Sequence, residues 1–247
     1  MNTIRLITLF AVVLFATAAN AQTEEIENVK AQIVTLFKPN CYVYYNVDGK
    51  NEIGTTKHVF VFVDRIEFRF KNKNSTFYFA DFCDYDIEIS LDNENLVDVT
   101  IEDFGITLRG GASVKRQADN LIFIRNYYCK KKYTSQLVLF EPIADKYCAL
   151  EVKPTVTEEQ RKYIVQANGF NEQKMYDKAI ELYKKAIEVN ATSYSAAYSN
   201  LALLHAQINA FDAAIYYMKK YLMLEPEASD ARSAQDKIYL WEAQITK

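Results

Sequence analysis

Apolar and polar residues alternate with a helical period through most of the segment 160–245. Side chains three or four positions apart share one face of an α-helix. In the segment 176–189, one face of the expected helix carries Ala179, Ile180, Tyr183, Ala186 and Ile187. The opposite face carries Glu181, Lys184, Lys185 and Glu188. This pattern predicts an amphipathic helix that buries its apolar face.

The chain carries this pattern twice. Ala214 lies 35 positions after Ala179 (214 − 179 = 35), and the same offset aligns other residues of similar size. The aligned pairs are Tyr163 with Tyr198, Ala167 with Ala202, Tyr176 with Phe211, Ile180 with Ile215 and Val189 with Leu224. Small residues allow two helix axes to approach closely, while large ones fill the space between helices. The offset therefore predicts two copies of a packed helix pair.

These residues resemble the tetratricopeptide repeat, in which helices A and B pack in series with a period of about 34 residues. The resemblance implies A helices around 163–170 and 198–205, and it implies binding of protein or peptide segments. Each repeat leaves an apolar face open, so we expect the helical segment 229–245 to cap the C-terminal end. We expect the first A helix to pack on residues 137–152.

In this family the A helices line a concave surface on which partners lie. The resemblance places eight residues there: Ile164, Asn168, Asn171, Ser199, Asn200, Leu203, Ala206 and Lys237. Members that bind a terminal carboxylate use two asparagines and three cations. Asn168 and Asn200 match the asparagines, but Ile164, Asp230 and Ala234 stand where cations belong. We therefore expect a mixed polar and apolar surface that does not select an acidic C-terminus. Alternatively, both asparagines form hydrogen bonds between helices.

The N-terminal half has a period of two, which is typical of strands. Ile66, Phe68 and Phe70 alternate with charged residues, as a half-buried strand requires. The pattern predicts strands at 42–45, 59–63, 66–70, 76–82, 85–91, 96–101 and 104–108, after a short helix within 22–40. A helix is expected from Ser113 to about Lys130, followed by an edge strand at 137–140 and a short helix at 142–150.

This order of elements predicts a β-sheet or small barrel capped by a helix. It resembles the bacterial pleckstrin-homology-like domains, which implies a weak contact between the basic end of the helix and anionic lipid. The predicted fold class is thus α+β with two domains. Residues 22–153 form the β-rich domain, and residues 154–247 form the repeat domain behind Pro154.

The first 21 residues have the features of a secretory signal. Arg5 precedes a mostly apolar run at 6–15, and Ala19-Asn20-Ala21 matches a cleavage site. We expect cleavage near Ala21 and export of a soluble chain to the periplasm or the medium. The mature chain keeps four cysteines, which allow two disulfides in three pairings. They are Cys41, Cys83, Cys129 and Cys148.

The remaining composition argues against catalysis. The net charge of −3 disfavours nucleic-acid binding. The two histidines, His58 and His205, fall in different predicted domains, and no phosphate-binding or hydrolase motif occurs. Acidic residues gather at 81–103 and basic residues at 113–132, which we interpret as solvated faces. We expect neither cofactor nor metal.

The leading hypothesis is an exported, non-enzymatic adaptor that binds a protein or peptide through its repeats. The alternative is a module whose β domain binds lipid or a small ligand, with the repeats serving oligomerisation. The sequence leaves the oligomeric state open.

Overall fold

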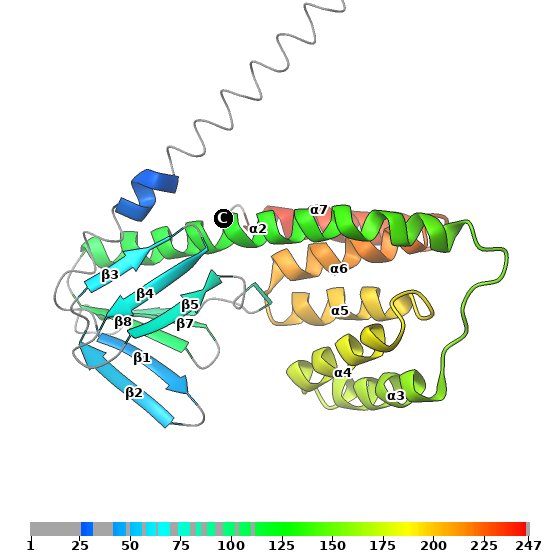
Figure 1. Ribbon diagram of the computed structural model, residues 1–247, viewed down its shortest axis with the longest axis horizontal. Coiled ribbons are helices and arrows are strands. Elements are labelled where there is room, and N and C mark those ends of the chain that lie inside the picture. The colour runs from blue at the N-terminus through cyan, green and yellow to red at the C-terminus, as the bar shows by residue number, and fades with distance from the viewer. Residues whose placement is uncertain are drawn as a thin grey trace, which may run out of the picture. The chain divides into compact units, whose positions relative to one another are not determined.

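The computed structural model has an α+β fold (Figure 1). It describes residues 26–31, 42–47, 50–55, 58–62, 64–69, 74–79, 83–84, 88–91, 96–101, 104–109 and 112–245. Contacts divide the chain into two compact units, one of Met1–Phe79 with Ile87–Arg125 and one of Ala80–Asp86 with Asn126–Lys247. These limits differ from the predicted domains because the contact boundary falls inside one continuous helix. The signal segment 1–21 and Cys41 lie outside the described residues.

The first unit contains two antiparallel sheets. The larger sheet has the order β2 (Lys50–Thr55), β1 (Tyr42–Val47), β8 (Phe104–Arg109), β7 (Leu96–Ile101), β6 (Glu88–Leu91). The smaller has the order β3 (His58–Val61), β4 (Arg65–Arg69), β5 (Asn74–Tyr78). Strands β1 and β2 pair antiparallel, with Val47 opposite Lys50. Closure into a barrel stays a prediction.

Strand β4 has the burial that its alternation predicts. Ile66 and Phe68 are buried, while Arg65 and Glu67 on the other face are partly exposed and form an ion pair of 2.9 Å. The predicted strands 76–82 and 85–91 are described only in part, as β5 and β6. Cys83 and Asp84, between these two strands, belong to the second unit.

Helix α2 (Ala112–Cys148) is much longer than predicted and contains Pro142. The predicted edge strand at 137–140 and the separate helix at 142–150 are therefore wrong. Phe140, Ala144 and Tyr147 explain the error, since they are spaced four and three residues apart and all three are buried. The apolar run at 137–140 covers more than one face of this helix, so its sequence pattern alone resembles that of a buried strand.

The second unit consists mainly of helices in consecutive antiparallel pairs, which is compatible with a helical repeat (Figure 1). Helices α3 (Glu158–Glu172) and α4 (Tyr176–Val189) form the first pair, and α5 (Ala196–Gln207) and α6 (Phe211–Leu224) the second, before α7 (Ala231–Ile245). The matched small residues Ala167, Ala202, Ala179 and Ala214 are all fully buried. The predicted register of helix contacts is thus confirmed.

The two pairs also share their turn. Lys174 and Asn209, 35 positions apart, have φ angles of 58° and 57°. In the first pair the amide of Met175 donates to the carbonyl of Phe170, and in the second the amide of Ala210 donates to that of His205, both at 2.9 Å. In each pair, this backbone hydrogen bond follows a residue in the left-handed conformation. The combination is the Schellman motif, which ends an α-helix. The repeat in sequence is therefore a repeat in backbone conformation.

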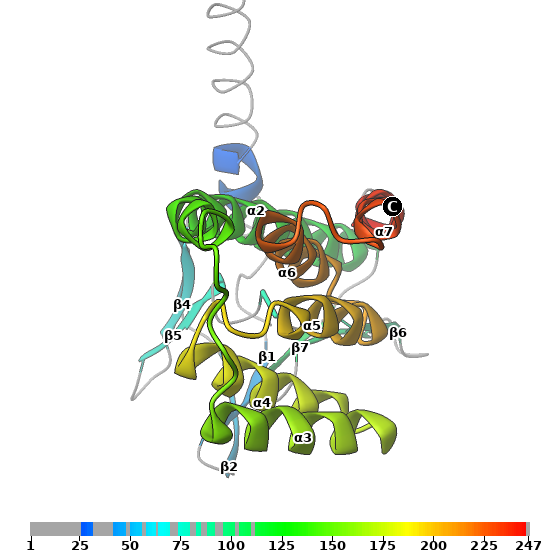
Figure 2. The same cartoon turned by 90° about the vertical axis from the view of Figure 1, so that its right-hand side faces the viewer.

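The second half of α2 packs on the second helix pair and α7. Phe140, Ala144 and Tyr147 share one buried cluster with residues of α5, α6 and α7. Figure 2 shows α2 and α7 on either side of α6. The ammonium of Lys220 lies 4.4 Å from the centre of the Phe140 ring, and the Tyr147 hydroxyl donates to Glu225 at 2.9 Å. The expectation that residues 137–152 cover the first A helix is wrong.

Candidate functional site

The surface predicted on the A helices is open on α5. Leu203 is 41% exposed, and Ser199, Asn200 and Ala206 are partly buried beside it. The opposite sides of α5 are filled: Leu201 and Leu204 pack toward the first pair, and Tyr198 packs toward α2 and α6. Both flanks of α5 are thus buried, whereas the large apolar side chain of Leu203 is exposed.

The corresponding residues of α3 differ from the prediction in one respect. Ile164 is buried, with 8% of its surface exposed, whereas Asn168 and Asn171 are exposed. Ile164 therefore contributes to packing and offers little surface. A predicted surface position on one repeat is thus a core position here, since the side chain at 164 is apolar and its counterpart, Ser199, is polar.

Asn168 and Asn200 share one hydrogen-bond partner. The Tyr183 hydroxyl donates to Asn168 Oδ1, and Asn200 Nδ2 donates to the same hydroxyl at 2.9 Å. Burial raises the pKa of Tyr183 to about 12. The chain joins α3, α4 and α5, so the alternative that both asparagines make bonds between helices is confirmed. Each amide keeps other donor or acceptor positions, because an amide group can make up to four hydrogen bonds.

On the capping helix, Lys237 donates to Ser233 Oγ at 3.0 Å. Two large apolar neighbours on the same helix, Tyr239 and Leu240, are exposed by 55% and 65%. Asp230 accepts a hydrogen bond of 2.6 Å from the Tyr221 hydroxyl. Its carboxylate is thereby held just before the start of α7, at one of the positions where the resemblance would require a cation.

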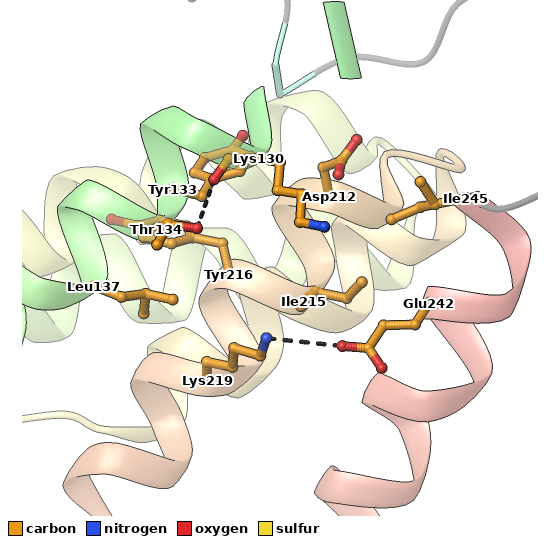
Figure 3. Close-up of a pocket in the computed structure, with 10 residues that line it drawn as sticks. All are labelled: Lys130, Tyr133, Thr134, Leu137, Asp212, Ile215, Tyr216, Lys219, Glu242 and Ile245. Atoms are coloured by element: carbon orange, nitrogen blue, oxygen red, sulfur yellow. Dashed lines mark hydrogen bonds and ion pairs between the residues drawn. The ribbon is translucent and has the colours of Figure 1, made fainter. Parts of the chain in front are cut away.

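A cavity of about 360 Å³ lies between α2, α6 and α7 (Figure 3). Its lining is partly apolar, from Leu137, Ile215 and Ile245, and partly charged, and Lys219 and Glu242 face each other across it at 3.8 Å. The other lining residues are Lys130, Tyr133, Thr134, Asp212 and Tyr216. Sequence reasoning missed this cavity because it depends on three helices and on the unexpected continuation of α2.

A second polar cluster surrounds Asp84. Lys184 Nζ lies 2.7 Å from Asp84 Oδ2, and the Tyr133 hydroxyl donates to Asp84 Oδ1 at 2.5 Å. Burial opposes ionisation of this carboxyl, but the Lys184 ammonium and the two hydrogen bonds outweigh it and lower the pKa of Asp84 to about 2. The neighbouring Cys83 forms a disulfide with Cys129 of α2. Cys148 is a free thiol.

His205 is fully buried, and the charges of Asp84 and Lys184 affect its ionisation. Its ring stacks on Tyr217 with 5.2 Å between the ring centres, and neither ring nitrogen makes a hydrogen bond of normal geometry with the described residues. Burial lowers the pKa of His205 to about 4, although the nearby Asp84 opposes this shift. His205 therefore packs in the interior of the helical unit, where a buried polar group without a hydrogen bond is unfavourable.

Within the described residues, no group of three or more His, Cys, Asp or Glu side chains is arranged to hold a metal ion. No helix in the described part of the chain is both long enough and apolar enough to cross a membrane.

We expect His205→Phe to remove part of the acid sensitivity of the protein. The unfolded imidazole binds a proton below about pH 6.5, whereas the folded one resists protonation until about pH 4. Between pH 7 and pH 4.5, the free energy of unfolding should therefore fall by about 2–3 kcal/mol more in the wild type than in His205→Phe. Urea unfolding at both pH values measures this difference.

His205→Gln is the matched control, because it also lacks the titration but leaves a buried amide without partners. It should lose the same pH dependence and still be less stable than His205→Phe at pH 7. An unchanged pH dependence in both variants would show that His205 does not titrate across the folding transition.

In comparisons with known proteins, no protein-family model and no curated protein matches this chain, so its function has to be argued from the geometry above.

Proposed function

We propose that the second unit is a binding module of the tetratricopeptide type, and that the protein is an exported, non-enzymatic adaptor. The supporting observation is the repeated geometry: two helix pairs with the same buried alanines and the same left-handed turn at Lys174 and Asn209. In that arrangement the A helices α3 and α5 offer one side to a partner. The Cys83–Cys129 disulfide favours an oxidising compartment, as expected of an exported chain.

The proposed contact surface centres on Leu203. An exposed leucine flanked by Ser199 and Asn200 provides an apolar anchor with hydrogen-bonding groups beside it, a combination that suits an extended peptide. Asn168 and Asn200 both form hydrogen bonds with the Tyr183 hydroxyl, so their main role is to fix the positions of the helices next to this surface. The surface has few cations, and we therefore infer that an acidic C-terminus is not its preferred ligand.

The test uses the full chain on a peptide array that includes apolar, polar and acidic C-terminal sequences. Leu203→Glu should lower the affinity for the peptides that the wild type binds by about tenfold or more, because it places a charge at the apolar anchor position. Val138→Glu is the matched control, since Val138 is also an exposed apolar residue on a helix of the same unit. Equal loss in both variants, or none in Leu203→Glu, would refute the assigned surface.

Tight binding of acidic C-terminal peptides would refute the inferred selectivity while leaving the surface itself in place. The alternative role of the β domain in binding lipid or a small ligand stays a prediction, because most side chains of its strands lie outside those that the structure describes.

A further inference from the structure

The cavity between α2, α6 and α7 has charges of both signs around an apolar floor (Figure 3). The Lys130 ammonium on α2 points into this space and has no ion-pair partner among the described residues. Lys219 of α6 and Glu242 of α7 face each other beside it, and Asp212 adds a second carboxylate. Ile215 lies between these groups. Two ammonium groups and two carboxylates balance, so these four side chains together carry no net charge.

The ion pair inside this cavity is loose. Lys219 Nζ lies 3.8 Å from Glu242 Oε1, whereas a direct hydrogen bond between an ammonium and a carboxylate measures about 2.7–2.9 Å. Both side chains are about half exposed, so the pair contributes little to stability and a ligand that inserts there displaces little. Glu242 makes other interactions too, but a carboxylate has about four lone-pair sites, so it also accepts a hydrogen bond from a ligand.

We propose that this cavity binds a free α-amino acid with an apolar side chain. The ligand carboxylate accepts hydrogen bonds from the two lysines, Lys130 and Lys219, and the ligand ammonium donates to Glu242. The ligand side chain packs on the apolar lining residues, which are Leu137, Ile215 and Ile245. This inference does not rest on the proposed peptide surface, which lies around Leu203 of α5.

The size and the charges of the cavity specify this ligand class. Its volume of about 360 Å³ lies near the lower end of the range of about 300–1,000 Å³ for ligand pockets, which indicates a small ligand. The two charged groups of an α-amino acid are bonded to one carbon, so they match opposite charges that lie side by side, as those of Lys219 and Glu242 do.

Ligands with a single charge fit this lining less well. An apolar carboxylic acid brings its negative charge close to Glu242, and an apolar amine meets the ammonium groups of Lys130 and Lys219. Like-charge contacts of this kind oppose binding. The cavity should therefore discriminate against both, although each shares the apolar side chain of the amino acid.

Isothermal titration calorimetry on the full chain tests this selectivity. The probes are L-leucine and L-phenylalanine, 4-methylpentanoate, which is leucine without its ammonium, 3-methylbutylamine, which lacks the carboxylate, and glycine, which lacks the side chain. We expect saturable binding of leucine or phenylalanine, and binding of each of the other three that is weaker by about tenfold or more. If neither amino acid binds, the site is refuted. If a singly charged analogue or glycine binds as tightly, the assigned ligand class is wrong.

Two variants locate the binding. Lys130→Met should weaken the amino acid that binds by about tenfold or more, because it removes a charge-assisted hydrogen bond. Glu242→Gln should weaken it similarly but should not weaken 4-methylpentanoate, which has no ammonium to pair. Both side chains are exposed, so we expect wild-type melting temperatures without ligand. If Glu242→Gln does not fold, Lys130→Met alone decides.

Lys131→Met is the matched control, because Lys131 is an exposed neighbour on the same helix that does not line the cavity. Leu203→Glu separates this inference from the proposed peptide surface and should leave amino-acid binding unchanged. Equal loss in Lys130→Met and Lys131→Met, or loss in Leu203→Glu, would place the binding outside this cavity and overturn the inference.

Discussion

Replacing Cys83 and Cys129 together by alanine should lower the free energy of unfolding by about 4 kcal/mol, because the bond closes a long loop and restricts the unfolded chain. The two cysteines are 46 positions apart. Alanine suits both positions, since they are fully buried and a serine hydroxyl would lack a partner. Urea unfolding followed by the fluorescence of Trp241, the single tryptophan, reports on the helical unit.

Cys148→Ala is the control for this measurement. Cys148 is a free, exposed thiol whose sulfur lies 3.5 Å from the carbonyl oxygen of Met223, a weak contact. Its loss should change the free energy of unfolding by less than about 0.5 kcal/mol. If the double variant unfolds at the same urea concentration as wild type, the disulfide does not stabilise the helical unit.

Gln160→Met should destabilise the protein by about 2–4 kcal/mol, since it keeps the shape of the side chain but removes a buried polar network. Gln160 Nε2 donates to the carbonyls of Ala186 and Asn190 at 2.9 and 3.0 Å. Its Oε1 accepts from the Ser193 hydroxyl at 2.5 Å. These bonds tie the start of α3 to the end of α4, and the side chain is almost fully buried.

The matched control is Gln166→Met on the exposed side of the same helix. Thermal unfolding of both variants separates the network from a general effect of methionine. A melting temperature for Gln160→Met equal to that of Gln166→Met would show that the network contributes nothing measurable. The sequence alone suggests only a capping role for Gln160, because its partners lie 26 to 33 positions away.

The sequence by itself determined the elements whose pattern is local. The helical period at 176–189 matches α4, and the same pattern 35 positions later matches α6. The alternation at Ile66 and Phe68 matches the burial of β4. These features follow from short-range periodicity, which fixes the buried face of each element before any partner is known.

Tertiary structure decided which elements meet. Residues 137–150 read as a strand and a short helix, yet burial of Phe140, Ala144 and Tyr147 against the second helix pair keeps α2 continuous through Pro142. Ile164 is buried whereas its counterpart Ser199 is only partly so, although the repeat alignment gives both residues the same position on their helices.

The cluster of Asp84, Lys184 and His205 is the clearest case of what only the tertiary structure shows. Asp84 and Lys184 are 100 positions apart, and Asp84 lies in an acidic stretch that reads as a solvated turn. Its carboxylate meets Lys184 because a disulfide anchors the adjacent residue to α2. Long-range contacts of this kind arise from chain topology and covalent closure, and neither leaves a periodic signal in the sequence.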